Sequence, residues 1–149
     1  MCGIAGIFLL DSANKDKLKS IKKMTDVLTH RGPNDEGFYF KDKIGLGHRR
    51  LNIIDLSANA KQPMFNEDHS LVLVFNGEIY NFQKLRKDLI KKGHKFKSQG
   101  DSEVILHLYE DHQTDCTKYL EGMFAFAIYD IQCEKLFLAP GRLGENPMY

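Results

Sequence analysis

A chain of 149 residues is long enough to bury a substantial core, and its length favours a single domain. The 21 lysines and arginines nearly balance the 20 aspartates and glutamates, so the net charge of +1 predicts no nucleic-acid or membrane partner. The sequence has no signal-peptide pattern and no apolar run of about 18 residues, so we expect a cytoplasmic protein. Three cysteines without a Cys-x-x-Cys pair predict reduced thiols.

The first half of the chain predicts three strands and one helix. Residues 4–10 are β-branched and aromatic and indicate a buried strand, and residues 11–15 indicate a turn. Apolar residues at helical spacing over 18–29 predict an amphipathic helix, which stops at a polar loop over 30–37. Short strands are expected at 38–40 and 44–46. Because successive strand side chains point to opposite sides, at most one of Arg49 and Arg50 should face a given cleft.

The second half contains the strongest strand signal. Residues 71–75 form a continuous apolar run that predicts a central strand buried on both faces. Asn76-Gly77 follows, and this dipeptide between apolar runs is typical of a two-residue hairpin turn. Two helices should come next, one ending before Gly93 and one over 104–109 that Asp101 or Ser102 caps. Residues 124–131 and 135–139 predict a hairpin, and no composition shift marks a domain boundary.

The chain could carry a nucleophile at its start. If Met1 is excised, Cys2 has both a thiol and a free α-amine that can act as its base. The simpler interpretation is a small apolar side chain packed in the first strand. An Asn amide and a neighbouring Gly N–H, such as those of Asn76 and Gly77, can supply two donors to an oxyanion. These residue types suit acyl transfer.

Two isolated charges suit the backbone ends of an amino acid. Arg50 offers a planar fork for a carboxylate, and Asp101 offers an acceptor for an ammonium. Each residue alone is weak evidence, since Asp101 is also a plausible helix N-cap. The histidines do not suggest a metal site, because His107 and His112 are five residues apart on a predicted helix and do not share a face.

Six segments taken together resemble, in the same order, the class II glutamine amidotransferases, most closely the glutaminase half of asparagine synthetases of the bacterial B type. The resemblance covers essentially the whole chain. The segments are Cys2-Gly3-Ile4-Ala5-Gly6, His30-Arg31-Gly32-Pro33-Asn34-Asp35, His48-Arg49-Arg50-Leu51, Asn76-Gly77-Glu78-Ile79-Tyr80-Asn81, Gly100-Asp101-Ser102-Glu103 and Glu121-Gly122-Met123-Phe124-Ala125-Phe126.

The resemblance implies an α+β fold, the four-layer αββα sandwich of N-terminal-nucleophile hydrolases, with Cys2 at the start of a central strand. Cys2 would attack the side-chain amide of L-glutamine, release ammonia and leave a γ-glutamyl thioester that water hydrolyses to glutamate. Asn76 and Gly77 would form the oxyanion hole, and the loop over 31–37 would lie near the pocket. The substrate-binding residues that it implies are Arg50, Ile53, Asn76, Gly77, Glu78 and Asp101.

The resemblance weakens near the end of the chain. Pro140-Gly141 stands where the family usually has Arg-Asp, and Asn146 stands where it usually has Lys. We therefore expect residues 1–149 to form a partial domain that lacks its last strands and has no synthetase domain. No cofactor or metal is expected, because ATP and Mg²⁺ would belong to the absent synthetase domain, and a separate synthetase partner would accept the ammonia.

Two alternatives remain at this point. The chain could be an inactive or truncated remnant that acts at most as a glutamine-binding module. It could also be a different N-terminal cysteine amidase that acts on another amide, although the pairing of Arg50 with Asp101 favours glutamine.

Overall fold

The computed structural model describes residues 1–10, 19–141 and 144–149, so the turn predicted at 11–15 lies outside the described residues. Among these residues, six of the seven strands and the three α-helices follow the predicted order, and the two-residue strand β4 was not predicted. The elements are β1 (Gly3–Phe8), α1 (Ser20–Asp26), β2 (Asp35–Lys41), β3 (Ile44–Arg50), the 3-10 helix η2 (Ala58–Ala60), β4 (Met64–Phe65), β5 (Leu71–Ile79), α2 (Phe82–Lys91), α3 (Glu103–His112), the 3-10 helix η3 (Gln113–Tyr119), β6 (Gly122–Asp130) and β7 (Lys135–Pro140).

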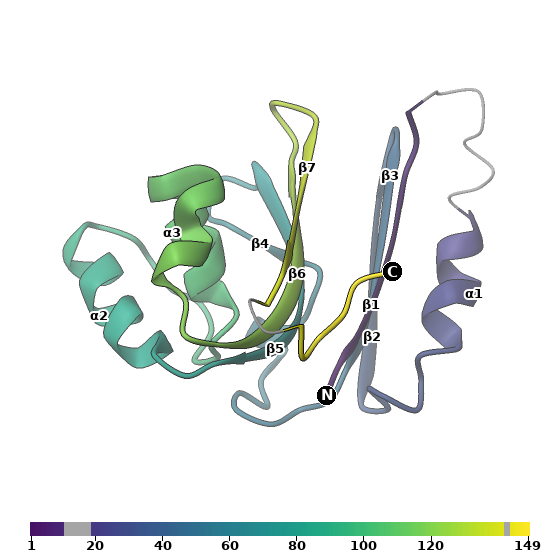
Figure 1. Cartoon of the computed structure of the whole chain (residues 1–149), viewed down its shortest axis with the longest axis horizontal. Helices are drawn as coiled ribbons and strands as arrows, with labels where there is room; N and C mark the ends of the chain where they lie inside the picture. The colour runs from purple at the N-terminus through teal and green to yellow at the C-terminus, as the bar shows by residue number, and fades with distance from the viewer. Residues whose placement is uncertain (11–18, 142–143) are drawn as a thin grey trace.

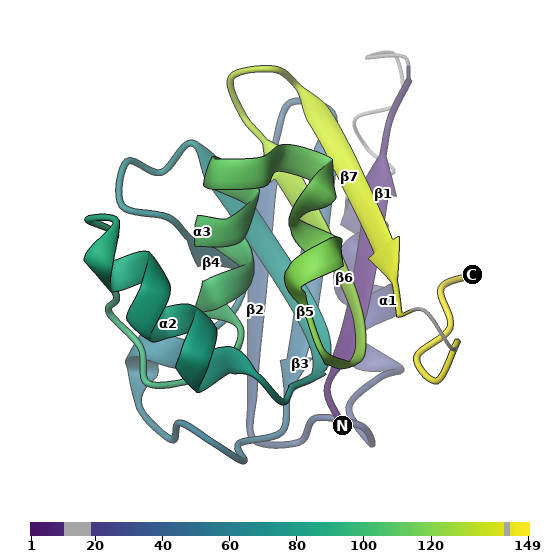
Figure 2. The same cartoon turned by 60° about the vertical axis from the view of Figure 1, so that its left-hand side comes forward.

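Two antiparallel sheets face each other in the middle of the molecule (Figure 1). One sheet has the strand order β1-β3-β2, and the other has the order β4-β5-β6-β7. Helix α1 covers the outer face of the first sheet, while α2 and α3 cover the outer face of the second (Figures 1 and 2). The layers therefore run α, β, β, α, which confirms the fold class that the sequence implied.

Strand β5 contributes side chains to two hydrophobic clusters, one on each face of its sheet. Val72 and Val74 pack between the two sheets against Ile44 and Leu46 of β3. The alternate residues of β5, such as Leu73, face α2 and α3 in the larger cluster on the other side of the sheet. Because side chains alternate along a strand, this arrangement explains why residues 71–75 are apolar without interruption.

Helix α1 lies very close to the sheet that it covers. A Cβ added to Gly47 of β3 would lie 2.0 Å from the Thr25 hydroxyl oxygen, so only glycine allows this approach. The predicted helix was too long at its end, because α1 stops at Asp26. Arg49 points toward this side and pairs with Asp26 at 2.6 Å and with Glu36 at 2.9 Å. Arg50 points to the other side, as predicted from strand alternation.

Two simpler local interpretations of the sequence do not hold in the structure. Asn76-Gly77 lies inside β5 and not in a hairpin turn, because β6 pairs with β5 along its whole length, Gly77 opposite Phe124 included. The tertiary pairing overrides the local preference of the dipeptide. Helix α3 starts at Glu103 with Ser102 at the N-cap position, and the Ser102 side chain makes no capping hydrogen bond. Asp101 does not cap the helix either, since its carboxylate accepts a hydrogen bond from the Ile79 amide.

None of the helices in the described part of the chain has the length and apolar character that crossing a bilayer requires.

A buried histidine between the sheets makes the stability depend on pH. The His48 side chain is 1% exposed, and its Nε2 lies 3.2 Å from the Phe75 carbonyl oxygen. Burial lowers the pKa of His48 to about 4, against the opposing effect of this hydrogen bond. As the pH falls below about 6.5, the unfolded chain protonates His48 while the folded chain does not, so the free energy of unfolding decreases.

We therefore expect His48 to remove roughly 3 kcal/mol of stability as the pH falls from about 7 to about 4. Denaturant unfolding at several pH values in this range measures the effect. The variant His48→Gln keeps an N–H donor without the titration, so the difference in stability between it and the parent chain should change with pH. A difference that is constant over this range would contradict the assignment.

Candidate active site

A cleft opens where the start of β1, the ends of β3 and β5, and the loop before α3 come together. The cleft is open to solvent and encloses about 590 Å³ of empty space when that open solvent is included. Of the seven residues predicted to form the site, six line this cleft. The lining residues are Met1, Cys2, Arg50, Leu51, Ile53, Ile54, Asp55, Ala60, Gln62, Phe75, Gly77, Glu78, Gly100, Asp101 and Ser102.

The Cys2 thiol is half-buried at the wall of the cleft. The Leu51 amide N–H donates to its sulfur at 3.4 Å. The thiol in turn donates to the Leu51 carbonyl oxygen at 3.8 Å, so Leu51 holds the sulfur through both of its backbone groups. On the other side, the Arg31 Nε donates to the Cys2 carbonyl oxygen at 3.0 Å and holds the backbone of this residue in place.

Arg50 is buried at the end of β3, with only 6% of its surface exposed. Its guanidinium donates to the Ser57 carbonyl at 3.0 Å and also to the Asp55 carbonyl. These bonds fix both the guanidinium and the loop that follows β3. A guanidinium has five N–H donors, so donors remain for a carboxylate in the cleft.

Asp101 supplies a buried carboxylate to the lining of the same cleft. Its Oδ2 accepts from the Ile79 amide at 2.9 Å, and the side chain has no cationic partner among the residues that the structure describes. Burial raises the pKa of Asp101, and the nearby charge of Glu78 raises it further. A cation that enters the cleft would relieve both effects, so this end of the pocket suits an ammonium group.

Asn76 is the predicted site residue that does not line the cleft. Its side chain is 7% exposed and lies on the same face of β5 as Val72 and Val74, toward the sheet that carries Cys2. The Asn76 Nδ2 donates to the Asn146 Oδ1 at 3.3 Å. An amide nitrogen carries two hydrogens, so this bond orients the group and leaves one N–H.

Gly77 has a structural requirement of its own. Its φ is +155°, and an added Cβ would lie 2.2 Å from the Met123 carbonyl oxygen and 2.6 Å from the Phe124 Cα. Both contacts are with backbone, which has no freedom to move away. Glycine is needed here for the pairing of β5 with β6, whatever its N–H does in the cleft.

Ile53 and the loop over 31–37 complete the surroundings. Ile53 is 57% exposed at the mouth of the cleft. Asn34 ties the loop to the end of β3, because its amide N–H donates to the Arg50 carbonyl and its Oδ1 accepts from the Asn52 amide, both at 3.0 Å. This loop therefore holds the segment that presents Arg50 to the cleft.

Sequence reasoning missed three contributors to the site. The Leu51 amide is a backbone donor, which no residue type reveals. Asn146 lies 70 residues from Asn76 along the chain and attracted notice only as a departure from the family pattern. Met1 lines the cleft, so the residue that must leave to free the Cys2 amine also occupies space beside the thiol.

This arrangement defines the class of protein. The family model of the glutamine amidotransferase domain matches residues 1–149, and the chain belongs to this family. Its structure is similar to that of glutamine phosphoribosylpyrophosphate amidotransferase from Bacillus subtilis, with a TM-score of 0.77 over 97% of this chain and 38% of that one. The sequence identity of 21% limits this likeness to the fold.

Among curated proteins, the chain is similar to glutamine-hydrolysing asparagine synthetases. It is 41% identical to asparagine synthetase 2 of Bacillus subtilis over 151 residues, which cover the whole chain and 20% of the synthetase. It is 38% identical to asparagine synthetase B of Escherichia coli over 149 residues, which cover the whole chain and 26% of that synthetase. The chain thus spans about a fifth to a quarter of the length of these relatives.

Proposed function

We propose that this glutamine amidotransferase domain hydrolyses the side-chain amide of L-glutamine with Cys2 as the nucleophile. One observation carries the proposal: a thiol, a buried guanidinium and a buried carboxylate without a cation line the same cleft. The guanidinium and the carboxylate match the two charged groups of an amino acid, and the thiol provides the group that attacks its side chain.

Substrate orientation follows from the charges. The α-carboxylate of glutamine binds the donors that remain on Arg50, and its α-ammonium binds Asp101, with Glu78 adding negative charge nearby. Ile53 covers the mouth of the cleft. With both charged ends held, the side-chain amide extends toward Cys2, and the reaction gains from this fixed orientation.

Removal of Met1 is the first requirement of the proposed mechanism. While Met1 is attached, the Cys2 nitrogen is an amide and has no lone pair available as a base. After removal, the α-amine takes the thiol proton as the sulfur attacks the amide carbon. The carbon–nitrogen bond then breaks, and the leaving nitrogen takes that proton and departs as ammonia.

Water completes the proposed cycle. It attacks the γ-glutamyl thioester while the α-amine accepts one of its protons, the carbon–sulfur bond breaks, and the proton returns to the sulfur as glutamate forms. Each attack places negative charge on the carbonyl oxygen. We assign the Asn76 Nδ2–H and the Gly77 N–H as the donors that stabilise this charge. These steps need no cofactor.

The fate of the ammonia belongs to the proposal as well. The relatives named above are glutamine-hydrolysing asparagine synthetases. By analogy, the ammonia made here passes to a synthetase that uses ATP and Mg²⁺, in the cytoplasm. The small net charge of +1 is consistent with a domain that binds neither nucleic acid nor membranes.

The test is to measure ammonia and glutamate released from L-glutamine by the chain with Met1 removed, after intact-mass analysis has confirmed the removal. We expect equal amounts of both products and no release by the chain that retains Met1. N-acetyl-L-glutamine lacks the ammonium group and should be a poor substrate.

Two results would contradict the proposal. No ammonia from a folded, fully processed chain would favour the alternative of a glutamine-binding remnant. Equal rates with L-glutamine and N-acetyl-L-glutamine would favour an amidase for another substrate, because the Asp101 carboxylate would then contribute nothing to binding.

A further inference from the structure

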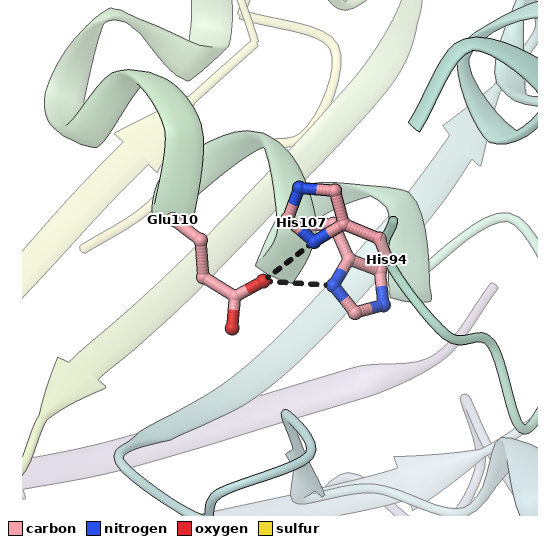
Figure 3. Close-up of side chains that lie close together, drawn as sticks. All are labelled: His94, His107 and Glu110. Atoms are coloured by element: carbon pink, nitrogen blue, oxygen red, sulfur yellow. Dashed lines mark hydrogen bonds and ion pairs between the residues drawn. The ribbon is translucent and has the colours of Figure 1, made fainter. Parts of the chain in front are cut away.

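A second cluster of chemically active side chains lies away from the cleft, on the helical side of the molecule. His107 and Glu110 belong to α3, and His94 lies in the segment between α2 and α3 (Figure 3). One potential ligand atom from each of the three residues lies within 4.8 Å of the others. The proposed glutamine hydrolysis uses none of them.

Both histidines turn the same ring nitrogen toward Glu110. The His107 Nδ1 lies 2.8 Å from the Glu110 Oε2, and the His94 Nδ1 lies 3.2 Å from the same oxygen (Figure 3). Two ligands of a tetrahedral metal with bonds of about 2.1 Å are about 3.4 Å apart. The Glu110 oxygen would therefore need to lie about 0.6 Å farther from the His107 nitrogen and about 0.2 Å farther from the His94 nitrogen to share a metal ion with them.

The other nitrogen of each ring faces a second carboxylate. The His94 Nε2 lies 3.0 Å from the Asp111 Oδ1, and the His107 Nε2 lies 3.9 Å from the Glu103 Oε1. Metal-binding histidines in proteins usually have such a partner, which sets the tautomer and orients the ring. Of the two histidines, His94 has this partner at hydrogen-bond distance, while the His107 Nε2 is too far from Glu103 for a hydrogen bond.

Further contacts hold the cluster in place and supply another oxygen. The Asn66 Nδ2 donates to the Glu110 Oε1 at 2.7 Å, which leaves Oε2 directed at the histidines. The Glu67 Oε2 lies 3.8 Å from the His107 Nδ1 and is a fourth potential ligand from a different segment. The Phe96 ring packs edge-on against His107 at 4.4 Å between centroids and covers one side of it.

The charges around the cluster favour a cation. The His107 side chain is only 1% exposed, and carboxylates surround it. The carboxylate oxygens of Glu110, Glu67 and Glu103 lie 2.8, 3.8 and 3.9 Å from its ring nitrogens. This environment attracts positive charge, and a metal ion would displace the proton from the ring when it binds.

We infer that His94, His107 and Glu110 form a binding site for a divalent transition metal of the zinc type, with Glu67 as an additional oxygen ligand. Imidazole nitrogens with carboxylate oxygens are a donor set that suits Zn²⁺. The metal would join α3, the segment between α2 and α3, and the segment between β4 and β5. Its role in this position is structural, because the cluster shares no residue with the cleft.

Zinc titration of the chelator-treated chain by calorimetry tests the inference. The titration uses the variant Cys2→Ser/Cys133→Ser, because accessible thiols also bind zinc. We expect one Zn²⁺ per chain and a higher Tm with zinc present. In this background, His94→Gln and Glu110→Gln should each weaken binding at least tenfold, and Asp111→Asn should weaken it by about 10- to 100-fold.

Exposed His30 provides the matched control, since His30→Gln should leave the zinc affinity unchanged. Nitrogen NMR of the histidine rings should show Nδ1 of both His94 and His107 bound to the metal. The absence of zinc binding would overturn the inference and leave an ion-pair cluster. Equal affinities for the parent, His94→Gln and Glu110→Gln chains would also overturn it, because the zinc would then bind elsewhere.

Discussion

Replacement of Cys2 by alanine is expected to reduce ammonia release from L-glutamine to the level without enzyme. The proposed reaction makes and breaks a bond at the Cys2 sulfur, and no other thiol lines the cleft in the described part of the chain. Loss of the nucleophile in a well-studied serine hydrolase costs roughly 10⁶-fold in turnover. A steady-state assay with processed chain measures the effect.

A second cysteine gives a matched control for this prediction. Cys133 is exposed in the turn between β6 and β7, so Cys133→Ala should keep full activity. Quenched reactions of the parent chain should also contain a protein species heavier by one γ-glutamyl group on Cys2. Activity of Cys2→Ala equal to that of the parent chain would overturn the assignment of the nucleophile.

The substitution Asn76→Ala is expected to lower kcat by roughly 10²- to 10³-fold, which corresponds to about 2.7–4 kcal/mol of transition-state stabilisation. The lost donor acts on charge that exists only after the sulfur attacks, so KM should change little. Because Asn76 is buried, a thermal unfolding curve must first show that the variant is folded. Steady-state kinetics with L-glutamine then measures kcat and KM separately.

A substitution at Asn146 distinguishes two roles of Asn76: direct donation to the oxyanion, and the hydrogen bond to Asn146 that orients the Asn76 amide. Asn146→Ala removes the acceptor at 3.3 Å but leaves the Asn76 amide in place, so its effect on kcat should be clearly smaller. A loss as large as that of Asn76→Ala would contradict direct donation by Asn76. An unchanged kcat for Asn76→Ala would leave the residue with a packing role inside β5.

Sequence reasoning was most successful where one residue pattern had one structural solution. The uninterrupted apolar run at 71–75 requires burial on both faces, and β5 has it. The alternation of strand side chains separated Arg49 from Arg50 correctly, because it depends only on backbone geometry. The placement of Cys2, Arg50 and Asp101 around one cleft came from the family resemblance, since residues from four segments meet there.

Predictions failed where distant partners determine the outcome. A dipeptide that favours a turn became part of a nine-residue strand, because β6 pairs along all of it. Asp101 has a typical capping position in sequence, yet its carboxylate bonds to the end of β5. The histidine cluster was not predicted for the same reason. His94 is 13 positions before His107, and the two rings come into contact only because the segment after α2 folds back over α3.

The close approach of β6 to Gly77 affects how the Asn-Gly pair would change over evolution. The Met123 carbonyl and the Phe124 backbone exclude any side chain at Gly77, so selection for folding alone would preserve this glycine. No such packing constraint demands an amide at position 76, apart from its single bond to Asn146. In a lineage that had lost the reaction, Asn76 and Cys2 would drift while Gly77 persisted. A glycine at this position is therefore a marker of the fold, and the asparagine beside it is the better marker of activity.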